Sequence, residues 1–392
     1  MNFFLKYKHI ILVFMFLLVF PVVISYSWMP VLFSIPLLIL LQFNLFKLKI
    51  INIVFAIYAL IILMILVTIN NQIIYIEWAR NLLFIPLIVV SYFIGNLLAE
   101  NDYYVRKTFL FFLFSAIFLV LYTFIFIVPL DLSLFFGERR GYIAQEFLLF
   151  GRKYEFSMGV THLNMYINLV IGFLFVCLVF EKKRYLNLTI GFFLVLSLLT
   201  QSRSPVLFFL IVSFIYMRYK FQESSQKLPL IVISVFLLVL LASFIMMIMN
   251  LNTDGNQTRF TFSGFSDISR LLFFIKGIEH MILEPWGNSL LYSDERMPLL
   301  NYHNTFIAIG NRMGLVSFFA LISLFFILVY RVRGVKNKEM KTAFYIITYF
   351  CFHNFMIEDV IKFDGFIIFI FLIFVPYVRR YYFIQERNEL NV

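Results

Sequence analysis

Long apolar segments, each bounded by charged residues, constrain this chain more than any other feature of its sequence. Their lengths of about 17–25 residues are what a helix needs to cross the hydrocarbon core of a bilayer. A helix satisfies its own backbone hydrogen bonds in that medium, which an irregular segment cannot do. The composition agrees, because 62% of the residues are hydrophobic and only 14% are charged. We therefore expect an all-α polytopic membrane protein.

We predict about twelve transmembrane helices. The candidate segments are residues 9–26, 29–46, 50–69, 82–98, 108–129, 159–180, 186–201, 204–219, 228–250, 304–330, 342–357 and 365–378. Together with short connections they use almost the whole chain, so residues 1–392 are expected to form a single integral membrane domain.

Lysine and arginine residues predict the orientation, since they collect in cytoplasmic loops. When the loops are sorted alternately to two sides, one set holds most of the 32 Lys and Arg residues. We assign that set, and both termini, to the cytoplasm. The formal net charge of +11 then reflects orientation and does not indicate a nucleic-acid partner. The two large loops, 131–157 and 251–303, fall on the outward side.

The second large loop contains a predicted amphipathic helix. Apolar residues repeat at helical spacing from Ile268 to Ile282, and Pro285 ends the pattern. The segment is too short and too charged to cross the membrane, so we expect it on the outer surface. Arg270 lies near its positively polarised N-terminus, where anions are favoured. An arginine on a solvated face is the alternative.

Two further side chains lie where predicted spans meet the outer surface. The imidazole of His303 can take a proton from a sugar hydroxyl near neutral pH, and Asn304 can orient that hydroxyl. A hydrogen-bonding histidine at the interface is the alternative. Arg203, in the turn 200–205, borders hydrocarbon, where a charge is costly without a partner. Its planar guanidinium suits phosphate oxygens, although a snorkelling side chain that anchors the turn fits the same pattern.

Other polar residues are candidate substrate-binding groups. His162 and Asn164 open the span after the first large loop and can line the same cavity, or they serve ordinary helix-start hydrogen bonding. Arg139 and Arg140 in that loop can hold an anionic lipid or glycan, or contact headgroups. For His353, near the outward end of the last helix pair, we predict structural hydrogen bonding between helices.

In order, spacing and outward placement, these pieces resemble the O-antigen ligase and polymerase superfamily. The pieces are the T-x-S-R turn at 200–203, the helix led by Arg270 and ended by Pro-Trp-Gly, and His303-Asn followed by Gly-x-x-x-Gly up to Gly314. The resemblance covers about 159–330 in motif and the whole chain in topology.

The resemblance implies a GT-C-like glycosyltransferase in a bacterial inner membrane, with its active site facing the periplasm and no metal or other cofactor. Its substrate is an undecaprenyl-diphosphate-linked oligosaccharide, and its other expected partners are membrane lipids and a candidate chain-length regulator. By motif match, Arg203 and Arg270 hold the donor diphosphate and His303 activates the acceptor hydroxyl. Inversion and release of undecaprenyl diphosphate follow.

Within the superfamily we favour a polymerase of repeat units over a ligase that transfers the polymer to lipid A core. Arg140 and Gly151 match the Arg-to-Gly spacing described for polymerases of the Wzy type, and the chain is rich in Phe and poor in Gly, like those polymerases. A flippase for the same lipid-linked unit is the alternative from another class, but it predicts polar residues at mid-span. A non-catalytic scaffold is a third possibility.

Overall fold

The computed structural model describes the backbone of residues 142–149, 152–181, 184–199, 203–223, 267–287, 304–357 and 365–390, with short helical pieces between 95 and 121. Side chains are described over 164–181, 186–195, 204–223, 273–287, 304–357 and most of 367–387. The predicted spans 9–26, 29–46, 50–69 and 228–250 lie outside the described residues.

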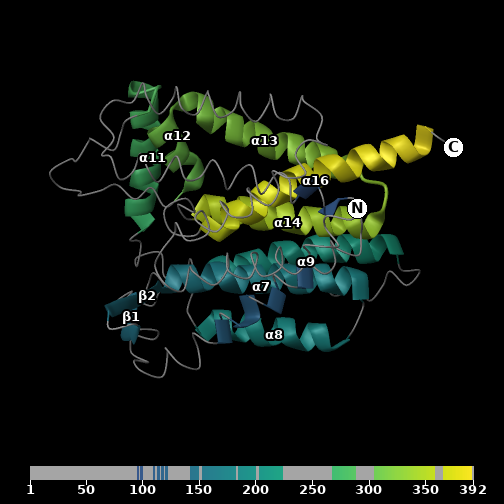
Figure 1. Ribbon diagram of the computed structural model, residues 1–392, viewed down its shortest axis with the longest axis horizontal. Coiled ribbons are helices and arrows are strands. Elements are labelled where there is room, and N and C mark those ends of the chain that lie inside the picture. The colour runs from purple at the N-terminus through teal and green to yellow at the C-terminus, as the bar shows by residue number, and fades with distance from the viewer. Residues whose placement is uncertain are drawn as a thin grey trace, which may run out of the picture.

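Helices dominate the described chain. They are α7 (Val160–Glu181), α8 (Arg184–Leu199), α9 (Arg203–Glu223), α11 (Asp267–Leu283), α12 (Thr305–Met313), α13 (Leu315–Gly334), α14 (Lys338–Ile357) and α16 (Gly365–Leu390). Figure 1 shows α7, α8, α9, α13, α14 and α16 side by side along one direction, whereas α11 lies across one end of this bundle.

Part of the first large loop forms a β-hairpin, which the sequence analysis did not anticipate. Strand β1 (Tyr142–Leu149) pairs antiparallel with β2 (Arg152–Gly159), in a register that sets Leu149 opposite Arg152. The hairpin leads directly into α7 and lies at the same end of the bundle as α11 (Figure 1). Arg139 and Arg140 precede it and lie outside the described residues.

Three described helices are long and apolar enough to cross a membrane, namely α7, α9 and α13. Two of them differ sharply in burial: in an 18-residue window of each, 89% of the residues of α7 are buried but only 17% of those of α13, whose mean hydropathy is 2.4. An apolar helix as exposed as α13 is stable against hydrocarbon rather than against water. The described part is therefore that of a helical membrane protein. The number of spans and the GT-C-like arrangement stay predictions.

Helix α14 forms the centre of the bundle and contacts α7, α9, α12, α13 and α16. Most of its apolar side chains are buried, and aromatic rings make many of the contacts. Phe344 packs edge-on against Phe374, and Phe350 packs edge-on against Phe208. Between α7 and α9, the ring of Phe208 lies over Gly172, whose missing Cβ leaves the space. Because lipid is as apolar as these rings, close packing and not burial from water holds such helices together.

The expected span 304–330 is wrong as a single helix. Helix α12 ends at Met313 and α13 begins at Leu315, with Gly314 between them at φ 87°. That left-handed conformation is open to glycine at little cost, and it interrupts the helix. Hydropathy does not register a change in backbone direction, which is why the apolar pattern looked continuous.

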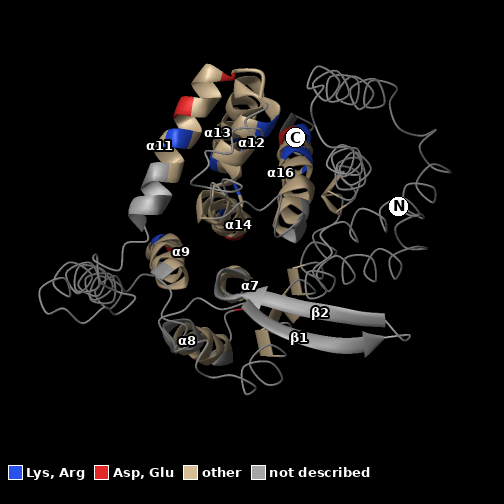
Figure 2. Ribbon diagram, turned by 90° about the vertical axis from the view of Figure 1, so that its left-hand side faces the viewer, with Lys and Arg blue, Asp and Glu red and all other residues tan. Residues whose placement is uncertain are grey.

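The helix predicted in the second large loop is confirmed as α11, and the Pro285 turn ends it as expected. Buried Gly277 and Met281 face inward, while Ile275 and Ile282 are exposed. Figure 2 shows charges of both signs along α11, in contrast to the mostly uncharged α13 and α14. Helix α11 is thus amphipathic and lies outside the packed bundle.

Candidate functional site

The predicted site residues are described to different depths. Arg203 is the first residue of α9, Arg270 lies in the first turn of α11, and His162 lies in the first turn of α7, but their side chains are outside the described part. His303 is also outside the described residues and directly precedes Asn304. Asn164 is described and buried near the start of α7. The predicted meeting of Arg203, Arg270 and His303 therefore stays a prediction.

Arg203, Arg270 and His303 all lie at or next to the start of a helix. Helix α9 begins at Arg203, α11 begins three residues before Arg270, and the N-cap of α12 follows His303. The first turn of a helix has unpaired N–H groups and a partial positive charge, so anions are favoured there. All three predicted catalytic residues thus come from helix N-termini, where a diphosphate is electrostatically favoured.

Asn304 is the N-cap of α12 and ties that helix to α14. Its side-chain Oδ1 accepts a hydrogen bond from the N–H of Ile307 at 3.1 Å. Its Nδ2 donates to the carbonyl oxygen of Met356 at 3.3 Å. The side chain is buried, so these bonds fix the backbone directly after His303. The substrate-orienting role predicted for Asn304 stays a prediction, while the capping role is part of the structure.

Helix α11 is joined to α12 by a buried amide. The Nδ2 of Asn311 donates to the carbonyl oxygen of Gly277 in α11 at 2.8 Å, and also to that of Ile307 at 2.9 Å. Near this bond, Met281 of α11 fills the space that the missing side chain of Gly310 leaves. The helix that carries Arg270 is thereby held against the helix that follows His303.

Two glycines bring the Pro-Trp-Gly turn onto the junction of α12 and α13. Gly287 and Gly314 both have positive φ, at 85° and 87°. A Cβ on Gly287 would lie 2.7 Å from the carbonyl oxygen of Arg312, and one on Gly314 would lie 2.6 Å from that of Pro285. The N–H of Leu315 donates to the Pro285 oxygen at 2.8 Å. Two motifs that are separate in the sequence are therefore in direct backbone contact.

A buried polar cluster, which sequence reasoning recognised only at His353, joins three helices. The cluster consists of Asn168 of α7, Ser204 of α9, and Tyr349, His353 and Asn354 of α14. Its hydrogen bonds join His353 Nε2 to Ser204 Oγ at 3.0 Å, His353 Nδ1 to Tyr349 OH at 3.3 Å, and Asn168 Nδ2 to Ser204 Oγ and to Asn354 Oδ1 at 3.4 Å each. Interhelical hydrogen bonding by His353 is thus confirmed.

The spacing of Asn164 and Asn168 was a signal for this cluster that the sequence analysis passed over. Residues four apart lie on one face of a helix, and both asparagines are buried in α7. Two buried amides on one face of an apolar helix need partners on a neighbouring helix. The sequence gives no indication that Ser204 and Asn354 would be those partners of Asn168.

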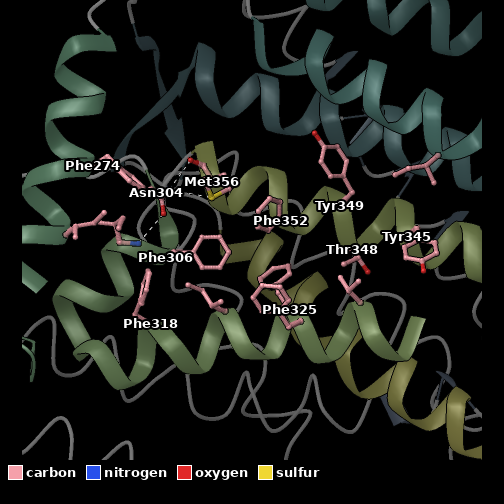
Figure 3. Close-up of a pocket in the computed structure, with 16 residues that line it drawn as sticks. Phe274, Asn304, Phe306, Phe318, Phe325, Tyr345, Thr348, Tyr349, Phe352 and Met356 are labelled. Carbon is pink, nitrogen blue, oxygen red and sulfur yellow. Dashed lines mark hydrogen bonds between the residues drawn. The ribbon is translucent and has the colours of Figure 1, made fainter. Parts of the chain in front are cut away.

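An apolar groove of about 550 Å³ lies between α11, α12, α13 and α14, with Ile215 contributing from α9. Figure 3 shows the lining side chains, with Asn304 and Phe274 at one end and Tyr345 and Thr348 at the other. Phenylalanine rings dominate the lining, among them Phe306, Phe318, Phe325 and Phe352.

Two of the residues of α13 that line the groove are exposed on the outside of the bundle. Phe326 and Val329 of α13 line it, yet they are 72% and 43% exposed. Because α13 is the least buried of the three candidate spanning helices, we expect this side of the groove to face hydrocarbon. A long apolar chain fits such a groove better than a polar ligand, which would find few hydrogen-bonding groups there. Tyr349 belongs both to the groove and to the polar cluster.

Within the described residues, no three His, Cys, Asp or Glu side chains gather closely enough to hold a metal ion. The metal-independent chemistry expected from the sequence stays a prediction. Comparison with protein-family models finds no match for this chain, and comparison with curated proteins finds none either. The resemblance to the O-antigen superfamily therefore rests on the residues quoted above.

Proposed function

We propose that this protein is an O-antigen polymerase. In this proposal it joins undecaprenyl-diphosphate-linked repeat units at the periplasmic face of a bacterial inner membrane, with inversion and without a metal. The observation that carries the proposal is the apolar groove that ends at Asn304, the residue after His303. A polyprenyl chain is apolar along its whole length and suits such a groove. Its diphosphate then lies near the groove's Asn304 end.

The arrangement of the surrounding helices supports this reading. Asn304 caps α12 and is bound to α14, which fixes the chain next to His303. Asn311 holds α11, and with it the helix start that contains Arg270. Ile215 of α9 and Phe274 of α11 line the same groove, so the two arginine-bearing helices border one space. Three helix N-termini near a diphosphate add their partial positive charge to that of the arginines.

The chemistry assigned to these residues is a single displacement. His303 takes the proton of an acceptor hydroxyl, whose oxygen attacks the anomeric carbon of the donor from the face opposite the diphosphate. As the bond from carbon to phosphate oxygen breaks, negative charge grows on the diphosphate that leaves. Arg203 and Arg270 stabilise that charge more in the transition state than in the ground state. Removing one such group costs about 10²–10³ in rate.

The test is complementation of a deletion strain with His303→Ala, Arg203→Ala or Arg270→Ala, scored by the length distribution of lipopolysaccharide. At normal protein levels each variant should lose the ladder of long chains. Arg→Lys substitutions should also lose it, because the planar guanidinium and not charge alone is required. Long chains in all three alanine variants would show that the assignment is wrong.

The deletion strain itself separates the functions considered. A single repeat unit on lipid A core is the result that a lost polymerase gives. Bare core with polymer retained on the lipid carrier would identify a ligase, and lipid-linked units left on the cytoplasmic face would identify a flippase. Unchanged lipopolysaccharide would exclude all three.

A further inference from the structure

The polar cluster around His353 includes Ser204, the residue that directly follows Arg203. Ser204 lies in the first turn of α9, and its hydroxyl is bonded from two sides, by His353 of α14 and by Asn168 of α7. Consecutive residues of a helix are 1.5 Å apart along the axis and rotated by about 100°. Fixing Ser204 therefore fixes the height and rotation of the Arg203 backbone.

His353 is itself held in one orientation. Its Nδ1 bonds the hydroxyl of Tyr349, and its ring packs against Phe208 and Tyr349 at centroid distances of 5.3 and 5.6 Å. A neutral imidazole has one donor and one acceptor nitrogen, and both find partners here. The ring is also buried. These contacts leave no ring nitrogen for a substrate, and of the two residues that His353 bonds, Ser204 is the one next to Arg203.

We infer that His353 is a positioning residue, which holds the first turn of α9 through Ser204 so that the guanidinium of Arg203 meets the diphosphate. The inference rests on the proposed function, because it takes Arg203 as a diphosphate ligand. A hydrogen bond between buried groups at an apolar boundary has little competition from water, so it fixes geometry effectively. Misplacement of a reacting group by about 1 Å can lower a rate by on the order of a hundredfold.

The experiment uses the full chain in proteoliposomes with a synthetic undecaprenyl-diphosphate-linked repeat unit. The variants are Ser204→Ala, His353→Phe, His353→Gln and the double variant Ser204→Ala with His353→Phe. Phenylalanine keeps a ring in place without its nitrogens, and glutamine offers an amide near the position of Nε2. The control is Thr342→Val on the same helix, which removes only a bond from the hydroxyl to the Lys338 carbonyl.

We expect Ser204→Ala and His353→Phe each to lower kcat by on the order of tenfold to a hundredfold. Inhibition by added undecaprenyl diphosphate should weaken in parallel, whereas inhibition by undecaprenyl phosphate should change little. The double variant should be no worse than the poorer single one, because both remove the same bond. His353→Gln should recover part of the rate, and Thr342→Val should match the unaltered chain.

Full activity of both Ser204→Ala and His353→Phe, with Arg203→Ala inactive, would overturn the positioning role and leave the proposed function standing. The positioning role would also be overturned if Thr342→Val lost as much kcat and thermal stability as Ser204→Ala and His353→Phe. A general packing defect would then explain all three variants. No polymer from the unaltered chain would instead overturn the proposed function, and the inference with it. Ser204→Ala removes only the hydroxyl oxygen and should fold. The test can therefore be made with that variant even if His353→Phe does not fold.

Discussion

The side-chain amide of Asn311 in α12 donates to the carbonyl oxygen of Gly277 in α11 at 2.8 Å. Asn311 is buried, and Gly277 is buried as well. A surface helix that lies across the end of a bundle is thus attached by a specific polar bond and not by apolar contact alone. Together with Met281 packed against Gly310, this bond holds α11, whose first turn contains Arg270.

Replacing Asn311 by leucine should therefore destabilise the protein and lower activity together. Leucine keeps the branched shape but removes the bond from α12 to the Gly277 carbonyl, which costs about 1 kcal/mol. Unfolding in mixed micelles measures the stability, and the lipopolysaccharide ladder measures the activity. Ser317→Ala is the control, because that hydroxyl bonds the Met313 carbonyl across the junction of α12 and α13 and not α11. If Asn311→Leu behaves like Ser317→Ala, the bond does not hold α11.

Gly314→Ala should be more damaging than an alanine substitution elsewhere in a helix. The new Cβ would meet the Pro285 oxygen at 2.6 Å, and φ at this residue is positive. Strain of this kind costs about 1–3 kcal/mol. Gly191→Ala is the matched control, since a Cβ there has nothing within 4 Å, and it should be neutral or stabilise by about 0.5–1 kcal/mol. Equal melting temperatures for the two variants would contradict the tight backbone contact.

Substitutions at Asn304 should distinguish what its N-cap bond contributes to stability from what its bond to α14 contributes. Asn304→Ser keeps an N-cap oxygen, whereas Asn304→Ala loses it at a cost of about 1 kcal/mol. We expect serine to retain more stability than alanine. Both variants lose the donor to the Met356 carbonyl, so both should polymerise less than the unaltered chain. A serine variant as unstable as the alanine variant would argue against capping as the main contribution.

Filling the groove should weaken binding of long-chain substrates selectively. Val329→Trp places bulk in the groove, and Val316→Trp places the same bulk on an exposed position of the same helix, α13, away from the lining. We expect Val329→Trp to raise KM for an undecaprenyl-linked unit by about tenfold and to affect a farnesyl-linked unit less. Kinetics with both lipids check this. The same KM in Val316→Trp and Val329→Trp would show that the chain binds elsewhere.

The sequence predicted several helices of the described part because its strongest signals are local. Helical periodicity and Pro285 delimited α11 within a residue or two of Asp267–Leu283. Runs of apolar residues likewise located α7 and α9 closely. The break at Gly314 escaped notice because a positive φ leaves no mark on hydropathy, and a glycine is tolerated inside an apolar run.

The site was less predictable, because its bonds join residues far apart in the chain. His353 and Ser204 are separated by 149 positions, and no spacing rule reaches that far. Helix starts, by contrast, could be located, and so Arg203 and Arg270 could be placed at them from the sequence.

The opening of the groove beside Phe326 and Val329 determines how a ligand reaches it. In the proposed function an apolar substrate enters from the bilayer. Its effective concentration is then its mole fraction among the lipids and not its amount per volume of water. Diluting the protein's vesicles with buffer should then leave occupancy unchanged, whereas adding plain phospholipid should lower it. The KM expected for the proposed polymerase should then depend on membrane composition.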